Sequence, residues 1–176
     1  MSRNRFVLIT GCSGGGKSSL LSGLKGKGYK VVEEPGRRIV NEERAGTGDA
    51  LPWVDPTAFA RRAVNMSRSD LLSAEHLRGT IFFDRGLIDA AVALQFACDI
   101  SLEETIGSTR PYNKTVFLAP PWPEIYQNDE DRRHDLETAM DEYDRLESAL
   151  TTLNYNIQFL PKVSIEDRVE FVLDRL

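Results

Sequence analysis

The chain has 176 residues and carries 22 lysines and arginines against 27 aspartates and glutamates, a net charge of −5. Nonspecific binding to nucleic acid or to an anionic membrane needs a basic excess, so neither partner is expected. No run approaches the ~20 apolar residues of a membrane span, and the two cysteines and two histidines offer no zinc-ligand spacing. From these observations we expect a single domain that spans residues 1–176 and a cytoplasmic location. They leave the oligomeric state open.

The first predicted strand, residues 6–9, runs into a glycine-rich stretch at residues 11–18 that fully matches the P-loop pattern G-x-x-x-x-G-K-[ST]. A helix is expected from residue 17 to a cap near residues 26–28, which gives the motif the flanks that it requires. Glycines let successive N–H groups point at one anionic centre. Lys17 would reach the β- and γ-phosphates of ATP, and the Ser18 hydroxyl would bind Mg²⁺. The expected nucleotide-binding residues are Gly11, Ser13, Gly14, Gly15, Gly16, Lys17, Ser18 and Ser19.

Residues 29–34 predict a second strand, which the breaker pair Pro35-Gly36 ends. The basic and polar residues 37–48 predict an irregular loop, whose arginines either contact an anionic acceptor or remain solvated. A helix of about six turns then begins with Asp55 as N-cap and Pro56 in its first turn, and is expected to end near Gly79.

Strands and helices alternate through the rest of the chain. Further strands are predicted over residues 80–84, 114–118 and 156–160. Further helices are predicted over residues 86–98, from a capping box at Ser101, and after an N-cap at Ser164. One long amphipathic helix should bury Leu136, Met140, Tyr143, Leu146, Leu150 and Leu153.

Five strands separated by helices predict an α/β fold, a three-layer α/β/α arrangement around a five-stranded parallel sheet, of the nucleotide-kinase-like P-loop type. Right-handed crossovers place the carboxyl ends of parallel strands along one edge. Five segments should therefore share that edge: residues 11–18, 33–34, 84–85, 120–133 and 161–162.

Two other classes of P-loop protein fit the sequence less well. A GTPase reads guanine with Asn-Lys-x-Asp after a late strand, whereas Asn113-Lys114-Thr115-Val116 lacks the aspartate and precedes its strand. A motor ATPase usually follows its magnesium-binding aspartate with a glutamate, whereas Arg85 follows Asp84. ATP is the expected nucleotide because no guanine motif is present.

Three more segments carry a family resemblance: Glu33-Glu34-Pro35, Phe83-Asp84-Arg85-Gly86, and Pro121-Trp122 with Asp131-Arg132-Arg133. With the P-loop, they resemble the nucleoside and nucleotide kinases, and in particular small bacterial AAA-domain ATP-binding proteins related to ribosylnicotinamide kinases. The first two are similar to the glutamate-proline and Asp/Glu-Arg-Ser elements of deoxynucleoside kinases, and the third to the lid of ribosylnicotinamide kinases. Two departures are present: the lid lacks the glycine of Asp-Gly-x-Arg, and Gly86 replaces the serine.

The resemblance implies an ATP- and Mg²⁺-dependent kinase acting on a small-molecule acceptor. Asp84 and Ser18 would hold Mg²⁺ and Glu34 would contact the acceptor hydroxyl, with Glu34 and Asp84 as alternatives for the base. Arg132 and Arg133, in a lid-like segment over residues 120–135, would close over the γ-phosphate or pair with neighbouring acids. A helical segment over residues 35–78 would hold the acceptor, with contacts expected from Glu34, Arg37, Arg38, Arg61 and Arg85.

Two further functions stay open on the sequence. A regulatory ATPase module would bind ATP, hydrolyse it slowly and signal to a protein partner. A toxin-like kinase would phosphorylate a cell-wall sugar nucleotide or a protein. A kinase should turn over ATP only with its acceptor, whereas a regulatory module should respond to the nucleotide alone.

Overall fold

The computed structural model describes residues 3–108, 110–125 and 136–176. Five strands form a sheet in the order β2-β3-β1-β4-β5, and every neighbouring pair is parallel. The strands are β1 (Phe6–Gly11), β2 (Lys30–Val32), β3 (Ile81–Asp84), β4 (Thr115–Ala119) and β5 (Asn156–Phe159). The predicted α/β fold with a five-stranded parallel sheet is confirmed.

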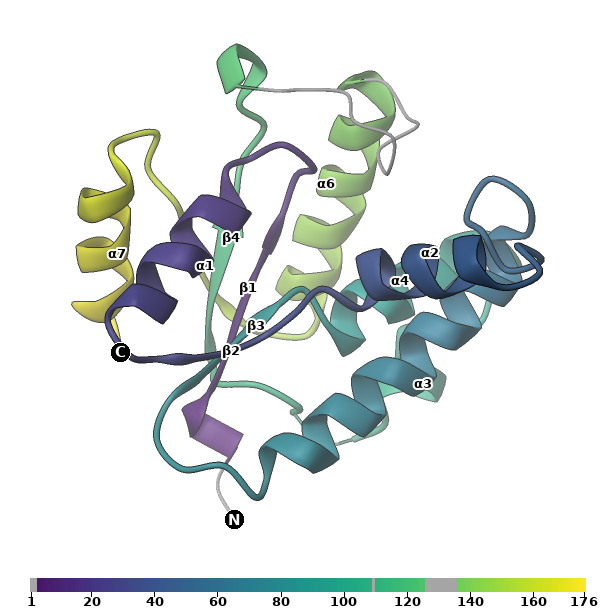
Figure 1. Ribbon diagram of the computed structural model, residues 1–176, viewed down its shortest axis with the longest axis horizontal. Coiled ribbons are helices and arrows are strands. Elements are labelled where there is room, and N and C mark those ends of the chain that lie inside the picture. Colours follow the sequence, from purple (N-terminus) through teal and green to yellow (C-terminus); the bar gives the residue numbers. More distant parts are fainter. Residues whose placement is uncertain (1–2, 109, 126–135) are drawn as a thin grey trace.

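Helices cover both faces of this sheet and complete the three layers (Figure 1). One face carries α1 (Lys17–Gly26) and α7 (Ile165–Leu173), which pack on each other. The other face carries α3 (Pro56–Ala74), α4 (Leu87–Cys98) and α6 (Leu136–Thr152), with α2 (Pro35–Ala45) packed on α3 and α5 (Leu102–Ile106) on α4. In the described part of the chain, no helix is long and apolar enough to cross a membrane.

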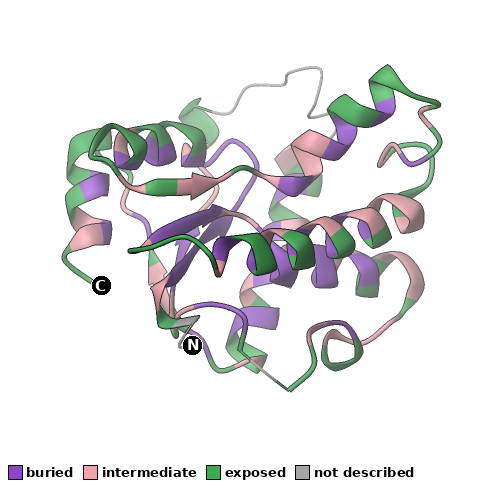
Figure 2. Cartoon of the chain, turned by 60° about the horizontal axis from the view of Figure 1, so that its bottom comes forward, coloured by how far each residue is buried: buried purple, intermediate pink, exposed green. Residues whose placement is uncertain are grey.

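Alternate side chains of the central strand β1 contribute to the two hydrophobic cores on opposite faces of the sheet. Phe6 and Leu8 belong to the core beneath α3, α4 and α6, whereas Val7 and Ile9 belong to the core beneath α1 and α7. Successive side chains of a strand point to opposite faces, so a strand covered on both sides reads as one continuous apolar run. Figure 2 shows the consequence, with the central strands drawn as buried and the outer helix faces as exposed.

The predicted irregular loop over residues 37–48 is wrong, because residues 35–45 form α2. Pro35 occupies the first turn of this helix, where a missing N–H costs nothing. Ile39 and Val40 are buried against the core, and the Glu43 carboxylate accepts the Ala50 N–H at 3.1 Å. The charges that suggested a loop are therefore the polar side of an amphipathic helix.

One helix end and one side chain also depart from the sequence predictions. The third helix ends at Ala74, one turn before the predicted end near Gly79. Met140, predicted on the buried side of α6, is 44% exposed, because Ala139 takes the buried position in that turn, whereas Tyr143, Leu146 and Leu150 are buried as predicted. The predicted caps are confirmed, since the side chains of Asp55, Ser101 and Ser164 accept N–H groups from the first turns of α3, α5 and α7.

Candidate active site

The P-loop joins β1 to α1 at the carboxyl edge of the sheet. Gly11 has a φ of 125°, and a Cβ atom there would lie 2.3 Å from the Ala119 carbonyl oxygen of β4. A Cβ on Gly15 would also meet Ala119, at 3.0 Å. These two glycines are required by the close passage of β4, because no side chain fits between the two backbones.

Lys17 is the buried cation of the loop. Its ammonium donates a 3.0 Å hydrogen bond to the Cys12 carbonyl, which folds the side chain back along the loop. Burial, with a smaller contribution from Arg85, lowers the pKa of Lys17 to about 8. Negative charge near the ammonium would favour its charged form, so this position suits the phosphates of a nucleotide.

A cavity of about 760 Å³ opens beside the loop. Its P-loop wall consists of Ser13, Gly14, Gly16, Lys17, Ser18 and Ser19. Glu34 from the end of β2, and Asp84 and Arg85 from the end of β3, line the same cavity. The structure thus brings these predicted residues together, whereas residues 161–162 lie outside the lining.

Asp84 reaches this edge because β3 pairs with β1, with Asp84 opposite Ile9. Its Oδ1 atom is buried, and no hydrogen-bond partner for it exists in the described part of the chain. Burial and the neighbouring Glu34 raise the pKa of Asp84 to about 6. Buried polar atoms are normally paired, so this oxygen is suited to a ligand that the protein does not itself supply.

Arg85 links three segments of the site. Its guanidinium donates to the Gly11 carbonyl at 3.0 Å and to Glu142 of α6 at 3.3 Å, and its Nε lies 3.6 Å from a Glu34 oxygen. Although burial opposes its charge, Glu142 and Glu34 raise the pKa of Arg85. The guanidinium thus hydrogen-bonds a backbone carbonyl and the Glu142 carboxylate, and its positive charge lies beside Glu34 as a longer ion pair, which favours a position of Glu34 close to the P-loop.

The arginines predicted to contact the acceptor differ in where the structure places them. Arg37 lines the cavity. Arg38 lies outside the lining and pairs with Asp70 of α3, while Arg61 is exposed and also outside the lining. Arg132 and Arg133 fall outside the described residues. Acceptor contacts from Arg38 and Arg61 therefore find no support in the placement of these side chains.

Comparison with known proteins shows which family this chain belongs to. The sequence pattern of the AAA-domain family matches residues 6–168. This chain belongs to the AAA-domain family. A search of curated protein sequences found no match to this chain.

Two solved structures resemble the AAA-domain protein along almost its whole length. Deoxyadenosine kinase from M. mycoides with bound dATP aligns at a TM-score of 0.70 and 13% identity, over 97% of each chain. The same enzyme with the products dCMP and a flexible dCDP bound aligns at a TM-score of 0.66 and 12% identity, again over 97% of each chain. At such identities the likeness shows the fold, which is that of a P-loop nucleoside kinase.

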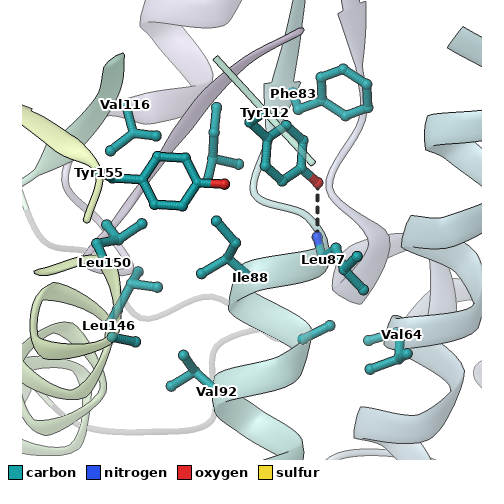
Figure 3. Close-up of a cluster of buried hydrophobic side chains, with 14 of the residues drawn as sticks. Val64, Phe83, Leu87, Ile88, Val92, Tyr112, Val116, Leu146, Leu150 and Tyr155 are labelled. Atoms are coloured by element: carbon teal, nitrogen blue, oxygen red, sulfur yellow. Dashed lines mark hydrogen bonds between the residues drawn. The ribbon is translucent and has the colours of Figure 1, made fainter. Parts of the chain in front are cut away.

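Gly86 of the AAA-domain protein stands where the related kinases were expected to have serine, and Tyr112 explains why. A Cβ atom on Gly86 would lie 2.0 Å from the Tyr112 hydroxyl oxygen. That hydroxyl accepts the Leu87 N–H at 2.8 Å, at the start of α4 (Figure 3). The tyrosine thus supplies an acceptor for the first N–H of α4, whereas the side chain of a serine at the N-cap would accept the N–H of the second or third helical residue.

The sequence patterns did not reveal two residues, Asp89 and Arg168, that contact the candidate active site. Asp89 lines the cavity and accepts hydrogen bonds from the Thr10 hydroxyl and from the Gly86 N–H, the latter at 2.9 Å. Its place three residues after Gly86, in the first turn of a helix, is a signal that could have found it. Arg168 of α7 donates to the carbonyls of Gly15 and Gly16, both at 3.0 Å. No local pattern marks this contact, because 153 residues separate Arg168 from Gly15.

Proposed function

We propose that this protein transfers the γ-phosphoryl group of ATP to a hydroxyl of a small-molecule acceptor, such as a nucleoside, a nucleotide or a similar metabolite. The proposal depends on one observation, the convergence of Lys17, Ser18, Glu34, Asp84 and Arg85 on a single cavity. The cavity continues past these residues over α2, α3 and α4, which leaves room for a second substrate. A module that only bound and hydrolysed ATP would not need that compartment.

The residues divide the reaction between them. Lys17 and the loop amides hold the donor phosphates, and Glu34, in an ion pair with Arg85, faces the acceptor hydroxyl. The acceptor oxygen forms a bond to the γ-phosphorus while the bond to the β–γ bridging oxygen breaks and ADP leaves. The hydroxyl proton passes to the Glu34 carboxylate. Positioning and charge neutralisation account for most of catalysis in this class of reaction.

Ser18 and Asp84 are suited to hold Mg²⁺. The unpaired buried Oδ1 of Asp84 and the Ser18 hydroxyl line the same cavity. Magnesium prefers oxygen ligands and takes few from the protein, and when bound here it would neutralise charge on the donor phosphates. Within residues 3–108, 110–125 and 136–176, no three His, Cys, Asp or Glu side chains gather as a metal-binding group, a composition that agrees with so sparse a protein ligand set.

The test is a screen for ADP release with nucleosides, nucleotides, sugars and vitamins as acceptors, run with Lys17→Ala and Asp84→Ala beside the unchanged protein. We expect one acceptor class to raise turnover well above the basal rate, and both variants to abolish the increase. Arg175→Ala is the control, since Arg175 is exposed, follows the end of α7, lies outside the cavity lining and contacts the carbonyl and the ring of Phe171. If no acceptor raises turnover and Asp84→Ala handles ATP normally, the proposal is wrong.

A further inference from the structure

Two cationic side chains of the cavity, Arg37 and Arg145, have no part in the proposed transfer step. Arg37 comes from the first turn of α2, and Arg145 comes from α6. Thr138, Glu142 and Arg145 line the cavity at positions i, i+4 and i+7, so they share one face of α6. Each guanidinium brings a permanent positive charge and several N–H donors to the cavity wall.

The Phe96 ring of α4 supports the guanidinium of Arg145. The Cζ atom of Arg145 lies over this ring, 3.9 Å from its centre, and both residues line the cavity. A guanidinium at this distance stacks by its flat face, so its N–H groups stay available in the plane of the group. The stack therefore places a set of hydrogen-bond donors at the cavity wall without using them.

The third arginine of the cavity wall differs from these two in its partners. Arg85 forms ion pairs with two carboxylates, Glu34 and Glu142. Within the described ranges of the chain, no carboxylate lies within ion-pair distance of Arg37 or Arg145. A cation at the wall of a cavity is partly removed from water, and an anionic ligand compensates that loss. The charges of Arg37 and Arg145 are therefore available to a ligand.

The position of Arg145 separates it from the donor phosphates. Asp89 marks the P-loop end of α4, because its carboxylate accepts a hydrogen bond from Thr10, which precedes the loop. Phe96 follows Asp89 by seven residues, which is about 10 Å of helix. The guanidinium on Phe96 thus lies toward the end of the cavity away from the P-loop. There it would contact the acceptor and not the transferred phosphoryl group.

We propose that the acceptor carries an anionic group, a carboxylate or a phosphate, that binds to Arg145, with the charge of Arg37 adding to the attraction. This inference rests on the proposed function and narrows its substrate class to hydroxy acids and phosphorylated hydroxy compounds. The hydroxyl that receives the phosphoryl group lies at Glu34, and the anion lies further along α4. The anion is a recognition group and not the phosphoryl acceptor itself.

The test compares hydroxyl compounds that differ in one anionic group. Two pairs serve: pantothenate with panthenol, whose hydroxymethyl group replaces the carboxylate, and thymidine 3′-monophosphate with thymidine. They are titrated calorimetrically into the full chain with saturating ADP and Mg²⁺, so that the P-loop is occupied. In at least one pair the anionic member should bind more tightly by about tenfold or more, as expected for hydrogen bonds to a charged group.

The two pairs also identify the anion. A larger difference between pantothenate and panthenol assigns a carboxylate, and a larger difference between the thymidine compounds assigns a phosphate. Added salt should weaken binding of the anionic members only. Neutral members that bind as tightly as the anionic ones, or no binding in either pair, overturn the inference.

Variants at Arg145 give a second measurement. Arg145→Gln should weaken binding of the anionic member by roughly 10- to 150-fold and leave binding of the neutral member unchanged. Arg145→Lys keeps the charge and should retain part of the affinity, and Arg37→Gln should give a smaller loss of the same kind. Arg175→Gln is the matched control, because Arg175 also lies over an aromatic ring, 3.6 Å from the centre of Phe171, but outside the cavity.

Equal losses for both members of a pair in Arg145→Gln would show that Arg145 only packs against Phe96. A loss no greater than that of Arg175→Gln would show that Arg145 does not bind the anion. Either result overturns the inference.

Binding and turnover separate the two proposals when ATP replaces ADP. An anionic member that binds through Arg145 without any release of ADP would leave the inference intact and count against phosphoryl transfer. ADP release with neutral acceptors alone, at a rate that Arg145→Gln does not change, would support phosphoryl transfer and overturn the inference.

Discussion

Arg85 shows how much a single residue determines here. One guanidinium contacts the Gly11 carbonyl, Glu142 and Glu34, which come from three separate elements. The residue has a positive φ of 55°, a conformation that residues other than glycine seldom adopt. Lysine would keep the charge but could not present several fixed donors in one plane.

We therefore expect Arg85→Lys to lower kcat/KM for the identified acceptor by about 100-fold, the cost of displacing a reacting group by ~1 Å. Steady-state kinetics measure this change, with Arg175→Lys as the control on an exposed arginine. An unchanged kcat/KM in Arg85→Lys would show that Glu34 is positioned without the fork of donors.

The contact between Gly86 and Tyr112 gives a second prediction at this scale. Gly86→Ser should destabilise the protein by about 1–3 kcal/mol, because its Cβ would overlap the Tyr112 hydroxyl. Tyr112→Phe alone should cost about 1–2 kcal/mol by leaving the Leu87 N–H without its acceptor. The double variant should be more stable than the sum of the two losses, because serine can then cap α4. Urea unfolding measures all three, and strict additivity would exclude this relation.

At the scale of elements, α7 braces the P-loop from behind. Arg168 is 2% exposed, its guanidinium bonds the Gly15 and Gly16 carbonyls, and it lies 5.5 Å from the centre of the Trp122 ring. The C=O and N–H groups of a trans peptide unit point in opposite directions. Carbonyls that bond Arg168 therefore leave the N–H groups of the same peptide units directed away from α7. We infer that α7 helps to orient the phosphate-binding amides.

Arg168→Met should weaken ATP binding by roughly tenfold, while Arg168→Lys, which can hold one carbonyl, should lose less. Calorimetric Kd values for ATP measure the effect without any acceptor. Arg175→Met, at an exposed position just after the end of α7, is the control. If melting temperature falls in Arg168→Met while the Kd for ATP does not change, Arg168 serves only the packing of α7.

Ion pairs with α3 add to the apolar packing that holds α2. Glu43 is nearly buried, pairs with Arg62 and accepts the Ala50 N–H, whereas Glu42 pairs with the same arginine at the surface. Glu43→Ala should destabilise the protein by about 2–3 kcal/mol, since it leaves a buried donor without a partner. Glu42→Ala should cost about 0–1 kcal/mol, as exposed ion pairs do. Equal losses in urea unfolding would show that the Ala50 contact contributes little.

At the scale of the whole molecule, the proposed binding of ATP at the sheet edge would couple ligand concentration to stability. A ligand at 100 times its Kd raises the free energy of unfolding by about 2.7 kcal/mol when it binds only the folded state. We expect ATP to raise the melting temperature of the unchanged protein, and to raise that of Lys17→Ala much less. A thermal scan with and without ATP measures both. An equal shift in Lys17→Ala would place nucleotide binding away from the P-loop.

Local chemistry was enough to predict the elements that define the fold. The five strands, the P-loop and the caps at Asp55, Ser101 and Ser164 each depend on residues within a few positions of one another. Short-range patterns of this kind reflect backbone geometry, which a sequence states directly. The parallel sheet followed, because alternating strands and helices allow few topologies.

Tertiary packing decided the rest of the candidate site. Residues 37–48 look like a polar loop in sequence, but residues 35–45 form a helix whose charges find partners on α3, and Arg38 pairs with Asp70 because those two helices pack together. The contact of Arg168 with the P-loop and that of Tyr112 with Gly86 join residues far apart in the chain. Spacing cannot encode such contacts, since they depend on how whole elements meet. The sequence by itself determined the P-loop with its flanking strand and helix, because that motif is local, and only the tertiary structure decided which side chains line the cavity beside it.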